Sequence, residues 1–132
     1  MVNVDTEKQL IEMTRGDNVS IVLSAAYPDD TPSSPHKYVA QTGDRLKLSI
    51  GKKYGSWLTE IVNEKTSSMT ADDFWTIEIK PEHTEELKFR DYFFDVQLEV
   101  YNSSADTYDI VTIIGKTDNV TPTIRLWGEV SE

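Results

Sequence analysis

The stretch from Asp91 to Tyr101 constrains the fold more than any other part of this sequence. Apolar or aromatic residues occupy every second position, namely Tyr92, Phe94, Val96, Leu98 and Val100. Because successive side chains of a β-strand point to opposite faces of a sheet, the alternation predicts a long strand with one face in the core. A strand of this length with a continuous apolar face is best placed centrally in a sheet.

Seven further segments repeat the alternation, and Gly, Pro, Asp, Asn or Ser residues separate them. They are Leu10–Met13, Asn18–Ser24, Leu46–Ile50, Trp57–Val62, Phe74–Ile79, Tyr108–Ile114 and Pro122–Trp127. Short strands at regular spacing favour two antiparallel sheets packed face to face. The sequence therefore predicts an all-β protein, an immunoglobulin-like antiparallel β-sandwich of seven to eight strands. The only expected helix is a turn or two at Glu82–Leu87, after Pro81.

The length of 132 residues fits one domain, which we expect to span residues 10–132 behind a mobile N-terminal arm of residues 1–9. The chain has no cysteine, so it forms neither disulfides nor thiolate sites. It shows no signal peptide and no apolar run long enough to span a membrane. The expected core comprises Ile21, Leu23, Leu48, Trp75, Ile77, Phe94, Val96, Leu98 and Ile113.

The net charge of −10 is unevenly spread, because residues 37–65 sum to +3 and the remainder to −13. An acidic domain repels phosphate backbones and anionic lipids, so we expect no nucleic-acid partner and no membrane insertion. Within the basic middle, Arg45 and Lys47 alternate with leucines and should project together away from the core, and Lys52 and Lys53 extend that surface. We hypothesise that these four residues bind a partner. The alternative is a solvated face that serves solubility.

Two short motifs are typical of turns, and one tyrosine has a structural role by analogy. Arg15-Gly16-Asp17 and Gly43-Asp44 each combine a glycine, which tolerates positive φ, with an aspartate that bonds nearby backbone. The first triplet also spells an integrin-recognition sequence, but we expect it to act only as a turn leading into a strand. Tyr92 should form a tyrosine corner, with its hydroxyl bonded to upstream backbone.

Four segments in a fixed order carry a resemblance to a known group of proteins. They are Met13–Asn18, Thr42–Leu48, Ile79–Leu87 and Tyr92–Leu98. The chain resembles small proteins and N-terminal domains from phages and prophages of Gram-positive bacteria, including the N-terminal domain of upper-baseplate proteins. The resemblance implies an immunoglobulin-like sandwich with a structural role in a phage tail or baseplate, acting in particle assembly or host attachment. Its partners would be other tail or baseplate proteins or further copies of itself, as a homo-oligomer, in the virion or in the bacterial cytoplasm before assembly.

Catalytic and metal chemistry have little to build on in this sequence. The two histidines, His36 and His83, stand outside any metal-ligand spacing, and the paired carboxylates lack the alternating ligand pattern of a calcium loop. We therefore expect no enzymatic activity, no cofactor and no metal.

An abundance of aromatic residues keeps a second class of function open, a carbohydrate-binding module. The aromatics in question are Trp57, Trp75, Trp127, Tyr27, Tyr38, Tyr54 and Tyr101. Two or more tryptophans exposed on one face would favour sugar binding. An apolar strand edge beside a flat polar face would favour subunit docking.

Overall fold

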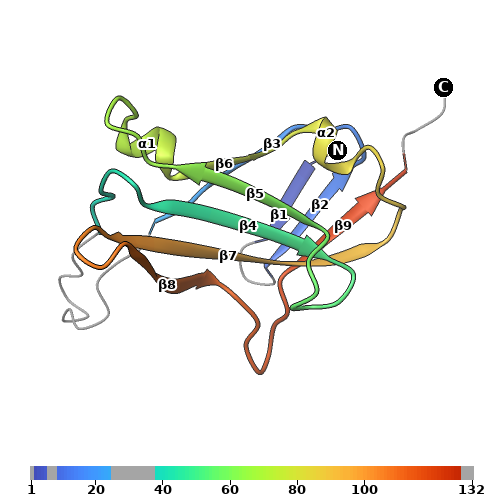
Figure 1. The fold of residues 1–132 in the computed structure, drawn as a ribbon. Helices are drawn as coiled ribbons and strands as arrows, with labels where there is room; N and C mark the ends of the chain where they lie inside the picture. Colours follow the sequence, from blue (N-terminus) through green and yellow to red (C-terminus); the bar gives the residue numbers. More distant parts are fainter. Residues whose placement is uncertain (1, 6–8, 25–37, 129–132) are drawn as a thin grey trace.

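The computed structural model describes residues 2–5, 9–24 and 38–128, and these are mostly β, as the alternation predicts (Figure 1). The strands are β1 (Val2–Asp5), β2 (Leu10–Thr14), β3 (Val19–Val22), β4 (Arg45–Gly51), β5 (Thr59–Glu64), β6 (Thr76–Ile79), β7 (Asp91–Asn102), β8 (Thr107–Ile114) and β9 (Thr123–Trp127). Two single-turn helices, α1 (Ala71–Phe74) and α2 (Pro81–Thr84), flank β6. Tyr27 and His36, both considered above, lie outside the described residues.

Strand β7 organises the larger sheet. Seven strands belong to this sheet, in the order β1-β2-β9-β7-β4-β5 with β8 also paired to β7. β4 lies along one edge of β7, while β9 and β8 share the other edge, at residues 91–93 and 96–102 respectively. Strands β3 and β6 form a separate two-stranded sheet, which lies over one face of the larger sheet in Figure 1. The central position expected for the long strand is thus confirmed.

Two features of the larger sheet differ from the sequence-based expectation. β2 and β9 are parallel, so the sheets are not wholly antiparallel. Parallel neighbours need a long connection, and these two strands are separated by most of the chain. In addition, residues 2–5 form β1 and pair with β2, although the expected arm of residues 1–9 included them.

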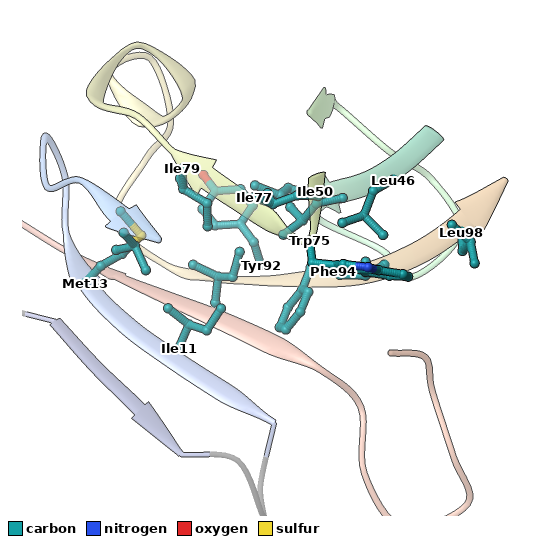
Figure 2. Packing of buried hydrophobic residues seen from close by; sticks show 14 of the residues in the cluster. Ile11, Met13, Leu46, Ile50, Trp75, Ile77, Ile79, Tyr92, Phe94 and Leu98 are labelled. Carbon is teal, nitrogen blue, oxygen red and sulfur yellow. The ribbon is translucent and has the colours of Figure 1, made fainter. Parts of the chain in front are cut away.

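The core lies between the two sheets (Figure 2). Six of the nine predicted core residues are buried, namely Leu48, Trp75, Ile77, Phe94, Val96 and Leu98. The other three, Ile21, Leu23 and Ile113, are half-buried and pack against this cluster. Strands β2 and β9 add residues that the prediction omitted, including Ile11, Met13, Ile124 and Leu126. The core therefore extends across the larger sheet from β4 to β2.

Helix α1 replaces the first residues of a predicted strand. Thr70 is the N-cap, and its hydroxyl accepts a hydrogen bond from the backbone N–H of Asp73 at 3.1 Å. Such a cap satisfies a donor that the first turn of a helix leaves unpaired. Phe74 consequently ends a helical turn rather than beginning a strand, and β6 starts only at Thr76. The second single-turn helix, α2, lies where a short helix was expected after Pro81. Its last residue, Thr84, is buried.

Hydrogen bonds confirm the predicted turn at Gly43-Asp44 and the predicted tyrosine corner. Gly43 has a φ of 99°, a conformation that favours glycine. The Asp44 carboxylate accepts hydrogen bonds from the Tyr38 hydroxyl at 2.6 Å and the Gln41 N–H at 2.8 Å. The Tyr92 hydroxyl donates to the Lys88 carbonyl at 2.9 Å, which anchors the chain as it enters β7.

Candidate functional site

The first half of the hypothesised basic surface faces away from the core, as the alternation predicts, but its charges are neutralised. The Nε of Arg45 lies 3.0 Å from an oxygen of Glu99, and its guanidinium stacks 3.8 Å from the ring centroid of Tyr108. The ammonium of Lys47 lies 3.8 Å from carboxylate oxygens of both Glu99 and Glu60. This part of the sheet is therefore a layer of mixed charge.

The second half of the predicted surface is separate from that layer. Lys52 and Lys53 are exposed in the connection between β4 and β5. There the backbone of Lys53 pairs with that of Ser56 in an isolated antiparallel β-bridge. Neither lysine makes an ion pair within the described part of the chain. The structure thus brings Arg45 and Lys47 together and leaves Lys52 and Lys53 as solvated charges.

A buried carboxyl group lies on the same outward face. Asp95 is 5% exposed, and its Oδ1 has no hydrogen-bond partner among the described residues. Burial raises the pKa of Asp95 because it penalises the charged form, while nearby Lys47 and a hydrogen bond with Ser49 act in the opposite direction. The carboxyl thus lies in an environment that favours its neutral form.

A second charged surface, which sequence reasoning missed, gathers three of the four arginines in the chain. A shallow hollow of about 260 Å³ is lined by Phe89, Arg90, Asp91, Arg125, Leu126 and Trp127. Arg15 adjoins it, because its guanidinium stacks 4.4 Å from the ring centroid of Phe89. We call these seven residues the arginine–aromatic hollow.

Strand register positions the polar side chains of the hollow. β9 places Ile124 and Leu126 in the core, so Arg125 and Trp127 point outward. Arg125 is flanked by Glu12 on β2 and by Asp91 on β7, each directly opposite it in register. Three strands thus present an acid–base–acid row on the outward face, next to an exposed tryptophan.

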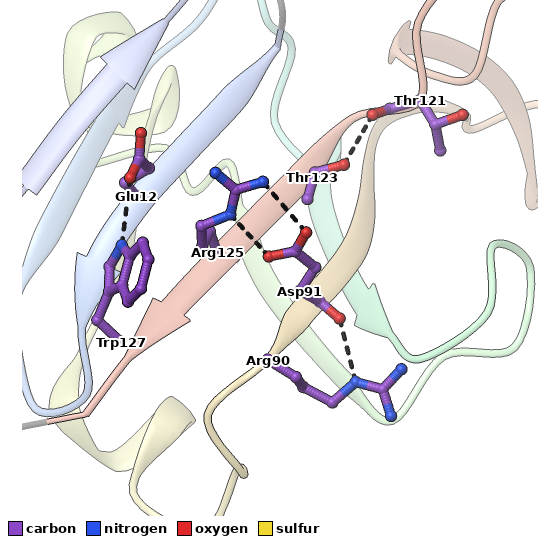
Figure 3. A network of polar contacts seen from close by, with 7 residues as sticks. All are labelled: Glu12, Arg90, Asp91, Thr121, Thr123, Arg125 and Trp127. Carbon is purple, nitrogen blue, oxygen red and sulfur yellow. Dashed lines mark hydrogen bonds and ion pairs between the residues drawn. The ribbon is translucent and has the colours of Figure 1, made fainter.

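Both acids of this row are engaged within the molecule (Figure 3). Asp91 accepts two hydrogen bonds from Arg125, at 2.9 Å from Nε and 3.3 Å from the terminal nitrogen, in the paired geometry that suits a guanidinium and a carboxylate. Glu12 accepts a hydrogen bond from the indole Nε1 of Trp127 at 3.2 Å. The indole is held in place while its side chain stays 46% exposed.

A turn and a glycine fix the position of Phe89. The Asp17 N–H donates to the Thr14 carbonyl at 2.9 Å, so the predicted turn at residues 15–17 is present and carries Arg15 over the phenylalanine ring. A side-chain carbon at Gly128 would approach that ring to 3.1 Å. Phe89 therefore lies against bare backbone on one side and under a guanidinium on another, and it remains 53% exposed.

Arg90 contacts backbone and an aromatic ring, since its guanidinium lies 5.8 Å from the ring centroid of Tyr92. Its Nε donates to the backbone carbonyl of Asp91 at 3.2 Å, and within the described ranges no carboxylate pairs with its terminal nitrogens. Arg125 is already paired with Asp91, whereas Arg90 has no carboxylate partner among the described residues, in a chain whose net charge is −10. Within the described part of the chain, Arg90 therefore places a positive charge without an ion-pair partner at this surface.

The tryptophans do not form a row. Trp75 is buried and contacts Phe74 and Tyr38 edge to face, with ring centroids 5.1 and 6.4 Å apart. Trp57 is half-buried against Tyr54 in the connection between β4 and β5. Trp127 is thus the one tryptophan of the described residues that is exposed.

The remaining candidate chemistry has structural explanations. The His83 Nδ1 accepts a hydrogen bond from the Lys80 N–H at 2.9 Å and so holds the start of α2. Among the described residues, no group of three or more histidine, aspartate or glutamate side chains is arranged to hold a metal ion. No helix in the described ranges is long and apolar enough to cross a membrane.

Comparisons with protein-family models, with curated proteins and with solved structures found no match to this chain.

Proposed function

We propose that the chain is a non-enzymatic structural component of a phage or prophage tail or baseplate, built as an immunoglobulin-like sandwich and acting in particle assembly or host attachment. Its partners are other tail or baseplate proteins or further copies of itself. It resides in the virion, or in the bacterial cytoplasm before assembly.

The observation that carries the proposal is the free edge of β8. This eight-residue strand pairs only with β7 among the described residues. Ile110 and Val111 lie near its middle, 59% and 47% exposed, and its one charged residue is Asp109. Natural proteins protect long apolar edges, since such an edge offers unpaired backbone groups to another chain. An edge left open in this way suits a protein that docks against a neighbouring subunit.

The two faces of β8 strengthen this interpretation. Ile110 lies opposite Glu99 and shares the outward face, while Val111 lies opposite Leu98 and points to the core side of the sheet. A partner strand added at this edge would cover both apolar side chains at once. The mixed-charge layer of Arg45 and Lys47 continues from this edge across the sheet and provides the flat polar face expected beside such a seam.

The resemblance to phage proteins supports the same conclusion. The four segments that carry it cover the end of β2 with the turn after it, the turn before β4 with the start of β4, the end of β6 with α2, and the first part of β7. Each has a structural rather than a catalytic role. Proteins that share a fold but no catalytic activity are expected to share segments of this structural kind.

A carbohydrate-binding module remains the second candidate, because Trp127 and Phe89 are exposed beside polar groups. Aromatic rings of this kind stack on sugar rings. However, Trp75 is buried, so the row of tryptophans expected for that function is absent from the described residues.

The proposal is tested by asking whether the chain is part of purified particles. Tail particles would be isolated after prophage induction from the source bacterium and probed by quantitative mass spectrometry. We expect the wild-type chain in a fixed ratio to other tail proteins, and we expect the Ile110→Lys/Val111→Lys variant to be excluded. Val62→Lys, at an exposed valine on β5, is the matched control and should be incorporated. Absence of the wild-type chain from particles would refute the proposal.

A further inference from the structure

We infer that the arginine–aromatic hollow is a binding site for an acidic segment of a partner protein, in which a carboxylate contacts Arg90 and Arg125 and a neighbouring apolar side chain covers Phe89 and Trp127. The site is distinct from the β8 edge. An acidic segment is the kind of partner that we assign to the docking role proposed above. The inference rests on that role only for the identity of the partner.

The composition of the hollow is that of an interface hot spot. Tryptophan and arginine are the residues most enriched where protein interfaces gain their binding energy, and aromatic residues in general are enriched there. Here Trp127 and Phe89 are 46% and 53% exposed, and arginines from three separate parts of the chain converge on them. These rings are also held in place, Trp127 by Glu12 and Phe89 by Arg15 and Gly128. Rings fixed before binding lose little conformational entropy on contact.

Charge selects an acidic partner. Residues 66–132, which contain Arg90 and Arg125, sum to −9, yet the two guanidinium groups of this segment lie together at the hollow. A guanidinium carries five N–H donors, and Asp91 occupies only two of those on Arg125. Arg90 uses its Nε on a backbone carbonyl and leaves its terminal nitrogens directed to no carboxylate of the described residues. A second carboxylate would fit these donors.

Hydrogen-bond chemistry disfavours a neutral sugar at the same place. Sugar hydroxyls both donate and accept, so a sugar site needs acceptors as well as donors. Of the two carboxylates at this surface, Asp91 already accepts two hydrogen bonds from Arg125, and Glu12 accepts one from Trp127. The unused guanidinium N–H groups of Arg90 and Arg125 are charged donors, and an ionised carboxylate, which only accepts, matches them better than a neutral hydroxyl does.

The experiment exploits the small number of arginines. The chain contains four, so a spectrum of arginine Nε–Hε groups has four signals, and Arg45, packed on Tyr108 in the mixed-charge layer, is an internal reference. The probe is the peptide acetyl-Gly-Asp-Glu-Phe-Asp-Glu-Gly-amide, and its neutral analogue carries Asn and Gln in place of the acids. We expect the acidic peptide to shift the signals of Arg90, Arg125 and the Trp127 indole saturably, with Arg45 unmoved and the neutral analogue inert.

Matched variants locate the site. Arg90→Gln should weaken peptide binding by about tenfold, the effect of losing one charge-assisted hydrogen bond. Lys52→Gln removes the same charge from an exposed position elsewhere and should leave the affinity within about twofold. Equal weakening by both variants would overturn the inference, because binding would then follow net charge alone.

Two other outcomes would also overturn it. One is that the peptide moves none of the hollow signals. The other is that an oligogalacturonate, an anionic saccharide, moves them while the peptide does not, which would make the site a saccharide site. Because these titrations use the purified chain, peptide binding would stand even if the chain proved absent from tail particles.

Discussion

The Asp44 carboxylate accepts a hydrogen bond at 2.9 Å from the backbone N–H of Tyr101, 57 residues further along the chain. Its other oxygen accepts from Tyr38 and from Gln41, so one fully buried side chain fastens the turn before β4 to the end of β7. Strands β4 and β7 are neighbours in the sheet, and this contact fixes their register at the end where β4 begins.

Replacing Asp44 by Asn should therefore destabilise the protein by about 2–4 kcal/mol. The amide keeps the shape but offers one acceptor oxygen in place of two, which leaves buried donors unpaired. Urea denaturation followed by fluorescence measures the change. Asp118→Asn, in an exposed loop, is the control and should shift the free energy of unfolding by less than about 0.5 kcal/mol. An equal effect in both variants would show that the contact is not important.

The core assignment is tested by two valine substitutions. Val96 on β7 is fully buried, whereas Val62 on β5 is 51% exposed. Val96→Asp buries an uncompensated carboxylate and should cost about 4 kcal/mol or more, enough to unfold a marginally stable domain. Val62→Asp leaves its charge in solvent and should retain a cooperative thermal transition. A folded Val96→Asp variant with an unchanged melting temperature would remove β7 from the core.

The contacts of Arg45 change what charge reversal is expected to do. The alternation alone suggests an exposed charge whose reversal would hardly affect folding. Arg45, however, pairs with Glu99, which is 8% exposed, and stacks on Tyr108. Arg45→Glu would place two carboxylates together and should destabilise the fold by about 1–3 kcal/mol, whereas Lys53→Glu should have almost no effect. Chemical denaturation of the two variants compares them directly, and equal stabilities would mean that the mixed-charge layer contributes nothing.

Local patterns predicted the strands well because side-chain alternation is a property of neighbouring residues. Tyr92, Gly43 and Pro81 were interpretable for the same reason, since turn and corner chemistry acts over a few positions. Helix α1 was missed because a single capped turn at Thr70 is too short to produce a helical period. Pairing between distant strands has no such local signature, so the parallel alignment of β2 and β9 had to come from the structure.

The arginine–aromatic hollow was missed for a related reason. Arg15, Arg90 and Arg125 lie far apart in the sequence, and the last two belong to a segment with a net charge of −9. Because charges were summed over consecutive segments of the sequence, these arginines did not stand out. The sums pointed instead to residues 37–65, where neighbouring acids neutralise Arg45 and Lys47. The scarcity of arginine was the available signal, because only four occur in the chain, and of these Arg90 is adjacent to Phe89 and Arg125 is two positions from Trp127.

The last prediction concerns Asp95 and the pH dependence of stability. Burial raises the pKa of its carboxyl group above the usual value near 3.8, despite the opposing effects of Lys47 and Ser49. Between the unfolded and the folded pKa, the native state binds more protons than the unfolded state, so the free energy of unfolding falls as pH rises. This contribution is complete below the unfolded pKa and is lost as pH rises through the folded pKa.

Asp95→Asn keeps a neutral side chain at every pH, so it should be more stable than wild type at pH 7 and should have a flatter stability profile above pH 4. Urea denaturation from pH 4 to pH 8 measures both effects, with Asp109→Asn on exposed β8 as the control for a surface charge. An Asn variant that is less stable than wild type at pH 7 would show that attraction to Lys47 outweighs the cost of burying the charge.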